Sequence, residues 1–147
     1  MEPQVRWEVN LKVVNEINCT EHWTVKSKRH KSQQRFIRLL FARDKKGIPF
    51  PCIVKFTRLS PRMYDDDSIA TAFKFIRDEL SELLIPEKAG FYINKKGKAV
   101  PIKGRADNDP RIKWEYAQEK SKRTLIRVEF WPIKLLPQDD IAHEDSQ

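Results

Sequence analysis

The chain has 147 residues, enough for one domain with a single hydrophobic core and too few for a second domain. Hydrophobic residues make up 39% of it, with eight Phe and four Trp, which excludes a chain that is disordered by composition. The formal net charge of +8 favours a polyanionic partner such as nucleic acid.

The first half of the chain predicts two strands and a helix. Apolar and polar residues alternate over residues 5–13, the pattern of a half-buried strand. A polar, basic loop is expected next, followed by a helix from its N-cap Ser32 to Gly47. Residues 49–60 predict a second strand, whose prolines are confined to its start.

The second half opens on the strongest helical signal, over residues 66–84, where apolar side chains recur at steps of three and four until Pro86. Residues 87–106 predict a basic hairpin or flap that turns at residues 95–97. Two alternating strands follow within residues 110–131, joined near residues 121–123, and we expect them to form an antiparallel hairpin.

This order, β-α-β-α-hairpin-β-β, predicts an α+β fold in which two helices pack on a mixed sheet of about four strands. We expect one domain over residues 1–131. Residues 132–147 carry a net charge of −3 and are expected to form a flexible acidic tail.

Two stretches that contain no acidic residue concentrate the positive charge: residues 26–38 and 88–105 each hold six Lys or Arg. One such run is typical of a solvated face, but two in so small a domain favour a surface that binds a polyanion. The expected nucleic-acid contacts are Lys26, Lys28, Arg29, Lys31, Arg35, Arg38, Lys95, Lys96, Lys98, Lys103 and Arg105.

Other classes of site lack their signatures. The sequence has no Gly-rich phosphate loop, so we expect no nucleotide cofactor. Its two cysteines have neither metal-ligand spacing nor the density of a disulfide framework, and its start lacks the apolar core of a signal peptide. No apolar run approaches the length of a membrane span, so a cytoplasmic protein is expected.

Three consecutive carboxylates precede the strongest helix. In an extended segment, side chains two apart point the same way, so Asp65 and Asp67 are expected to converge while Asp66 points elsewhere. One carboxylate suffices to cap a helix. A convergent pair is instead typical of a Mg²⁺ site, which waters and phosphate oxygens complete.

Asp107 and Asp109 form a second acidic cluster, directly before a predicted strand. The plain interpretation is a turn, because Asp and Asn before Pro are common there. If this strand lies beside the strand that ends near Arg62, both clusters can meet at one sheet edge. Together they would then form the metal site of a phosphodiester hydrolase.

The two acidic motifs, "DDDSIATAFKFIRDEL" and "DNDPRIKWEYAQEK", resemble those of the RusA-type Holliday-junction resolvases of phages and prophages. In that resemblance Asp65 and Asp67 match the first two catalytic aspartates, and Ile69 matches a Leu of the motif. Asp109 matches the later aspartate, with Asp107 as the alternative. The similarity extends over about residues 5–131, including the basic segment before the first helix.

The resemblance implies a small homodimeric endonuclease that uses Mg²⁺ or Mn²⁺ to nick branched or four-way-junction DNA. Two positions depart from the pattern. Ser68 stands where the family usually has Asn, and Thr71 stands where it has a catalytic Lys. Lys74 lies on a similar helix face and either replaces that lysine or is an ordinary surface residue.

Three hypotheses therefore remain. The chain is a metal-dependent endonuclease with Asp65, Asp67, Asp109 and Lys74 as catalytic residues, or a non-catalytic nucleic-acid-binding module of the same fold. The third hypothesis is a prophage accessory protein whose basic faces bind another protein.

Overall fold

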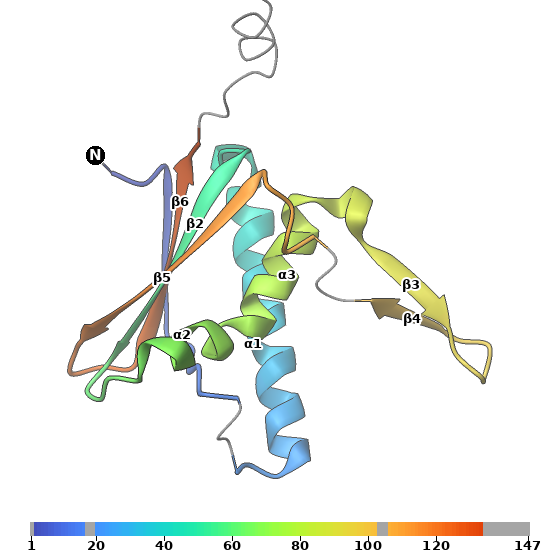
Figure 1. Ribbon diagram of the computed structural model, residues 1–147, viewed down its shortest axis with the longest axis horizontal. Helices are drawn as coiled ribbons and strands as arrows, with labels where there is room; N and C mark the ends of the chain where they lie inside the picture. The colour runs from blue at the N-terminus through green and yellow to red at the C-terminus, as the bar shows by residue number, and fades with distance from the viewer. Residues whose placement is uncertain (1, 17–19, 103–105, 134–147) are drawn as a thin grey trace, which may run out of the picture.

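A four-stranded mixed sheet and two long helices form two layers in the computed structural model, which describes residues 2–16, 20–102 and 106–133 (Figure 1). The α+β fold is therefore confirmed. The main sheet contains β1 (Val5–Val9), β2 (Cys52–Ser60), β5 (Ile112–Lys120) and β6 (Leu125–Pro132). The helices are α1 (Trp23–Asp44), α2 (Asp66–Ala72) and α3 (Lys74–Leu84), with 3₁₀ turns at Lys45–Gly47 and Pro86–Lys88.

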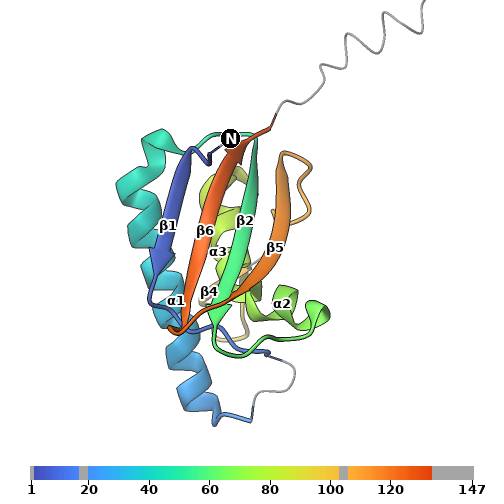
Figure 2. The same cartoon turned by 90° about the vertical axis from the view of Figure 1, so that its left-hand side faces the viewer.

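The helices cover one face of the sheet, as Figure 2 shows with the strands in front. The core lies between the two layers. Its fully buried members come from β1, β2, β6 and the helical layer and include Trp7, Ile37, Val54, Phe56, Phe73, Ile76, Leu80, Ile126, Val128 and Phe130. Cys52 is buried among them, and burial raises the pKa of its thiol to about 12, so it serves as a small apolar residue.

The strand order is β1-β6-β2-β5, in which β2 is parallel to β5 and antiparallel to β6 (Figure 2). The predicted parallel pairing is confirmed, but the predicted hairpin of the last two strands is wrong because β2 lies between them. β2 has the most buried side chains of the four strands. A central position gives such a strand neighbours on both sides. The turn after β5 passes the end of β2, where the Ser121 amide donates to the Ser60 carbonyl at 3.0 Å.

Helix α1 begins at Trp23, nine residues before the predicted N-cap Ser32, so the basic part of the predicted loop belongs to the helix and only its first part is a loop. Its actual N-cap is His22, whose Nδ1 accepts a hydrogen bond from the Thr24 amide (3.3 Å). The buried residues of α1 begin only at Gln33, because its first turns extend beyond the sheet (Figure 1). Those turns therefore carry no apolar stripe from which a sequence pattern predicts a helix.

The predicted helix over residues 66–84 is broken at Phe73 into α2 and α3. Phe73 has φ −96° and ψ 6°, and its ring stacks on Phe56 with the centroids 4.9 Å apart. The apolar positions of both halves still face the core, as their spacing predicts. The break lets the chain change direction between the two helices while one buried residue anchors both (Figure 1).

The predicted flap is a separate hairpin of β3 (Gly90–Ile93) and β4 (Ala99–Ile102), paired antiparallel. Its turn lies where it was predicted, with Gly97 at φ 78°, a conformation that favours glycine. The hairpin projects away from the two layers (Figure 1). Lys103, Arg105 and most of the predicted acidic tail lie outside the described residues. Among the described helices, none is long and apolar enough to cross a membrane.

Candidate functional site

A pocket of about 530 Å³ opens at the end of the sheet where β2 leads into α2. Two chain segments wall it: the one that follows β1 and the one that joins β2 to α2. The residues that line it are Lys12, Val14, Asn15, Thr20, Glu21, Met63, Tyr64, Asp65 and Ser68. The pocket thus contains the first predicted metal ligand, Asp65.

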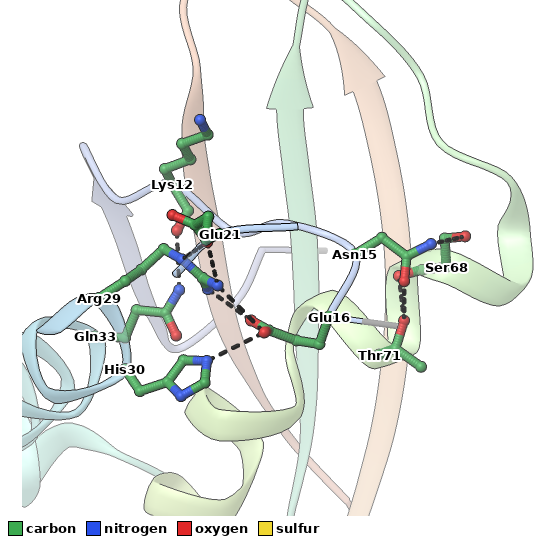
Figure 3. Close-up of polar contacts among 9 residues, drawn as sticks. All are labelled: Lys12, Asn15, Glu16, Glu21, Arg29, His30, Gln33, Ser68 and Thr71. Atoms are coloured by element: carbon green, nitrogen blue, oxygen red, sulfur yellow. Dashed lines mark hydrogen bonds and ion pairs between the residues drawn. The ribbon is translucent and has the colours of Figure 1, made fainter. Parts of the chain in front are cut away.

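Asn15 joins the two walls (Figure 3). Its Nδ2 donates to the Ser68 hydroxyl at 2.9 Å, and its Oδ1 lies 3.3 Å from the Thr71 hydroxyl. Ser68 and Thr71 are the two positions that depart from the resolvase pattern. Both departures therefore have a structural role here, because they hold the segment after β1 against α2.

The segment that joins β2 to α2 is held by two further residues. The amide side chain of Gln118 in β5 bonds to both backbone groups of Tyr64, at 2.9 and 2.6 Å, as a neighbouring strand would. Arg58 is only 5% exposed, donates to the Arg62 carbonyl and lies 3.6 Å from the centroid of the Tyr64 ring. These residues fix the backbone directly before the carboxylates.

A partly buried ion-pair cluster lies next to the pocket and shares Glu21 with its lining (Figure 3). Arg29 contacts Glu16 at 2.6 Å and Glu21 at 2.8 Å, and His30 Nε2 lies 3.1 Å from Glu16. Burial acts to raise the pKa of Glu16, but the hydrogen bonds from Arg29 and His30 outweigh it, so this pKa lies below its usual value. The His30 ring stacks on Phe75 of α3, with centroids 3.6 Å apart. Arg29, a predicted DNA contact, thus has a structural role.

Asp65, Asp66 and Asp67 all have exposed side chains at the beginning of α2. The chain is helical from Asp66 onward, so the extended segment from which Asp65 and Asp67 were predicted to converge is not found. Asp65 is the N-cap residue, but its side chain makes no capping hydrogen bond. Within the described part of the chain, none of the three carboxylates has a hydrogen-bond or ion-pair partner. Three negative charges without a partner in the described residues therefore stand together next to the pocket, whose lining includes Asp65.

Asp109, the predicted later ligand, lies at the opposite end of the sheet. The parallel register pairs Cys52 with Ile112 and Ser60 with Lys120, so Asp109 precedes the start of β5 while Asp65 follows the end of β2. Eight residue steps of strand separate these ends, about 26 Å at 3.3 Å per residue. A cluster that follows one strand and a cluster that precedes its neighbour meet only if the two strands are antiparallel. In parallel strands such as β2 and β5, both clusters would have to lie at the same end of their strands. The predicted meeting of Asp109 with Asp65 and Asp67 is therefore not found.

Asp109 is also fully engaged. It is 6% exposed, and its carboxylate contacts Lys88 Nζ at 2.8 Å and Arg111 Nε at 3.0 Å. It accepts a third hydrogen bond from the Arg111 amide. The hydrogen bonds from Arg111 and Lys88 hold its pKa far below the usual range, and the group serves to fix the loop before β5.

Asp107 lies before β5 and contacts Arg77 of α3, and Lys74 is the first residue of that helix. The Asp107 carboxylate is 3.9 Å from Arg77, and its carbonyl accepts from the Trp114 indole at 2.8 Å. Burial and then the charge of Asp107 raise the pKa of Asp78. Lys74 is exposed at the first residue of α3. In the described ranges, no three His, Cys, Asp or Glu side chains are grouped so as to hold a metal ion.

The predicted DNA contacts of α1 separate into a partly buried group, Lys26 and Arg29, and an exposed group. Lys28, Lys31, Arg35 and Arg38 are exposed at steps of three and four, so they form one stripe along the helix. Arg38 at its end contacts the buried Glu79 at 3.4 Å. The start of this stripe lies at the same end of the molecule as α2 (Figure 1).

Sequence analysis did not single out Asn15, Arg58, Tyr64 or Gln118 as site residues. None of them belongs to a recognisable sequence motif. Their roles become visible only from their contacts with other residues in the folded chain. No family model matches the chain, no curated protein matches it, and no solved structure matches it.

Proposed function

We propose that the protein is a divalent-metal-dependent endonuclease for branched DNA, of the RusA-like kind, and that the pocket beside Asn15 is its reaction site. The observation that carries this proposal lies next to that pocket. There, three exposed carboxylates without a partner in the described residues stand on a protein whose net charge is +8.

The donor chemistry of Asp65 and Asp67 suits Mg²⁺ or Mn²⁺, because hard cations prefer carboxylate oxygens. One or two carboxylates suffice when substrate phosphate and water complete the shell. When bound, such a metal activates water and offsets the charge that develops on the scissile phosphate. Asp109 does not fit this role, because Lys88 and Arg111 already neutralise it at the far end of the sheet.

The remaining residues of the site position and bind. Asn15, through Ser68 and Thr71, keeps the start of α2 at the mouth of the pocket. Lys28, Lys31 and Arg35 form a stripe that suits successive phosphates of a DNA backbone, and Lys74 is a further exposed cation at the start of α3. Contacts of this kind fix the register on DNA without reading its sequence. A homodimer in the cytoplasm, with one such site in each copy, completes the proposal.

A non-catalytic DNA-binding module is the second candidate. The pairing of Asp109 with Lys88 and Arg111 favours it, because the acidic set implied by the resolvase resemblance is then incomplete in one chain. In this case the basic stripe of α1 binds DNA and the carboxylates only begin a helix.

The deciding experiment incubates the protein with a labelled four-way junction or a linear duplex of the same sequence, each with Mg²⁺ or EDTA. We expect Mg²⁺-dependent nicking of the junction, lost by at least 100-fold in Asp65→Asn and Asp67→Asn. Asp66→Asn is the matched control, since it removes an equally exposed charge one residue away. Junction binding without nicking would favour the second candidate over the first. An equal loss of nicking in all three variants would contradict the assignment of Asp65 and Asp67 as the metal ligands.

A further inference from the structure

The hairpin of β3 and β4 carries the largest group of exposed apolar side chains on neighbouring residues in the described chain. Phe91, Tyr92 and Ile93 are consecutive and are 66%, 53% and 61% exposed. The pairing places Phe91 opposite Pro101 and Ile93 opposite Ala99, and all four of these residues are exposed. One face of the ribbon is therefore wholly apolar and open, with Tyr92 on the other face.

This face takes no part in the hydrophobic core of the described residues. The hairpin pairs with itself as a two-stranded sheet, and it points away from the main sheet and helices (Figure 1). A two-stranded ribbon with exposed aromatic residues is unfavourable in water unless something covers it. Exposed apolar surface of this kind marks a binding surface.

The charge of the hairpin indicates what covers it. Lys95, Lys96 and Lys98 are all exposed in its turn, and residues 88–102 contain no acidic residue. Asn94 Oδ1 accepts hydrogen bonds from the amides of Lys96 (2.9 Å) and Lys98 (3.0 Å). The turn is thus built to a defined shape and presents three cations next to an apolar face.

We propose that this hairpin binds DNA at a branch point: Phe91 on its apolar face and Tyr92 on the opposite face each stack on a base that has lost a stacking neighbour, and the three lysines contact the flanking phosphates. Aromatic stacking is favourable only where a base face is uncovered, so a continuous duplex offers no place for these rings. The inference depends on the proposed DNA substrate but not on cleavage. It assigns the choice of branched over linear DNA to the hairpin rather than to the pocket.

A second copy of this chain is a less suitable occupant. The hairpin turn and the exposed stripe of α1 are both positive, on a protein of net charge +8, so two copies meeting through them would bring like charges together. DNA has the complementary charge, and its bases supply the flat apolar surface that the aromatic residues require.

The test measures binding to a four-way junction and to a duplex of the same sequence in EDTA, by fluorescence anisotropy, with 2-aminopurine at the crossover. We expect the double variant Phe91→Leu/Tyr92→Leu to bind the junction about 100-fold more weakly, since each of the two stacked bases contributes roughly a factor of ten. Duplex affinity should not change, and the 2-aminopurine signal at the crossover should be lost. Phe50→Leu is the matched control, because Phe50 is an aromatic residue 43% exposed outside the hairpin.

The triple variant Lys95→Gln/Lys96→Gln/Lys98→Gln should weaken binding to both DNAs and reduce the slope of log affinity against log salt by up to about three. The leucine variants keep the hairpin apolar, and their circular dichroism and Tm should match the wild type. Unchanged junction affinity in both hairpin variants would overturn the inference.

Two other results have separate meanings. If the wild type forms a dimer that Ile93→Asp dissociates in analytical ultracentrifugation, the apolar face binds a second copy and the inference is overturned. If the wild type binds the junction tightly, loses that preference in Phe91→Leu/Tyr92→Leu and never nicks it with Mg²⁺, the inference stands and the proposed nuclease activity fails.

Discussion

The two acidic clusters of this protein have nearly the same pattern and opposite environments. Asp65–Asp67 and Asp107–Asp109 each contain two aspartates separated by a single residue, near the start of a helix or strand. The first cluster is exposed and has no partner in the described chain, whereas Asp109 is buried between Lys88 and Arg111. The spacing of acidic residues thus says little about their role, which depends on the cations that folding brings near them.

Whether a carboxylate has cationic partners also decides whether it stabilises the fold or is available to bind a ligand. A carboxylate held by two cations and a backbone amide lowers the energy of the folded state and has little capacity left for a metal. A carboxylate without a partner contributes little to folding and remains free to bind a cation. Four measurements test whether the two clusters differ in this way.

Replacing Asp109 should cost the most stability. Asp109→Asn leaves Lys88 and Arg111 without their shared anion, and we expect a loss of about 2 kcal/mol, or roughly 6 °C in Tm for a domain of this size. Asp67→Asn is the control and should shift Tm by less than about 2 °C. Equal shifts in thermal unfolding would mean that the two clusters do not differ.

Acidification should reproduce much of this loss. The folded-state pKa values of Asp109 and Glu16 lie below their unfolded values, near 4, so the unfolded state binds more protons at low pH. Their stabilisation is complete above about pH 5 and decreases as the pH falls through the folded-state values. Tm of the wild type should therefore fall more steeply below pH 4 than that of Asp109→Asn. Parallel curves for the two proteins would contradict the assignment.

Loss of the tie between Asn15 and α2 should have a smaller effect, concentrated at the first cluster. Asn15→Ala removes the hydrogen bond to Ser68 and the contact with Thr71, at a cost of about 1 kcal/mol. Amide hydrogen exchange of residues 66–72 should accelerate while that of β2 stays unchanged. Thr71→Val tests the weaker contact alone, and unchanged exchange in both variants would show that α2 is held by other residues.

The smallest effect is expected at Asp66. Asp66→Asn removes a favourable charge from a helix N-terminus but also relieves repulsion with its two neighbours, so the free energy of unfolding should change by less than about 0.5 kcal/mol. Urea unfolding measures it. A loss above about 1 kcal/mol would reveal a partner that the exposed position does not show.

Local pattern was sufficient for much of the fold. Alternation identified the strands, because one face of each packs on the core, and the three-four spacing from Ile69 to Leu80 identified the buried face of α2 and α3. Gly97 identified the turn of the basic hairpin, because the turn requires a positive φ that glycine adopts readily. These features depend on neighbours in the sequence, and the sequence by itself therefore determines them.

Long-range contacts decided the rest. The start of α1 has no apolar stripe, because those turns contact the rest of the protein through polar side chains such as Arg29 and His30 rather than through the core. Strand order depends on pairing between distant segments, and it placed β2 between the two strands expected to form a hairpin. The parallel register of β2 and β5 then put Asp109 and Asp65 at opposite ends of the sheet. Two acidic motifs are visible in the sequence alone, but only the tertiary structure decides whether they meet, because that distance is set by strand direction rather than by spacing.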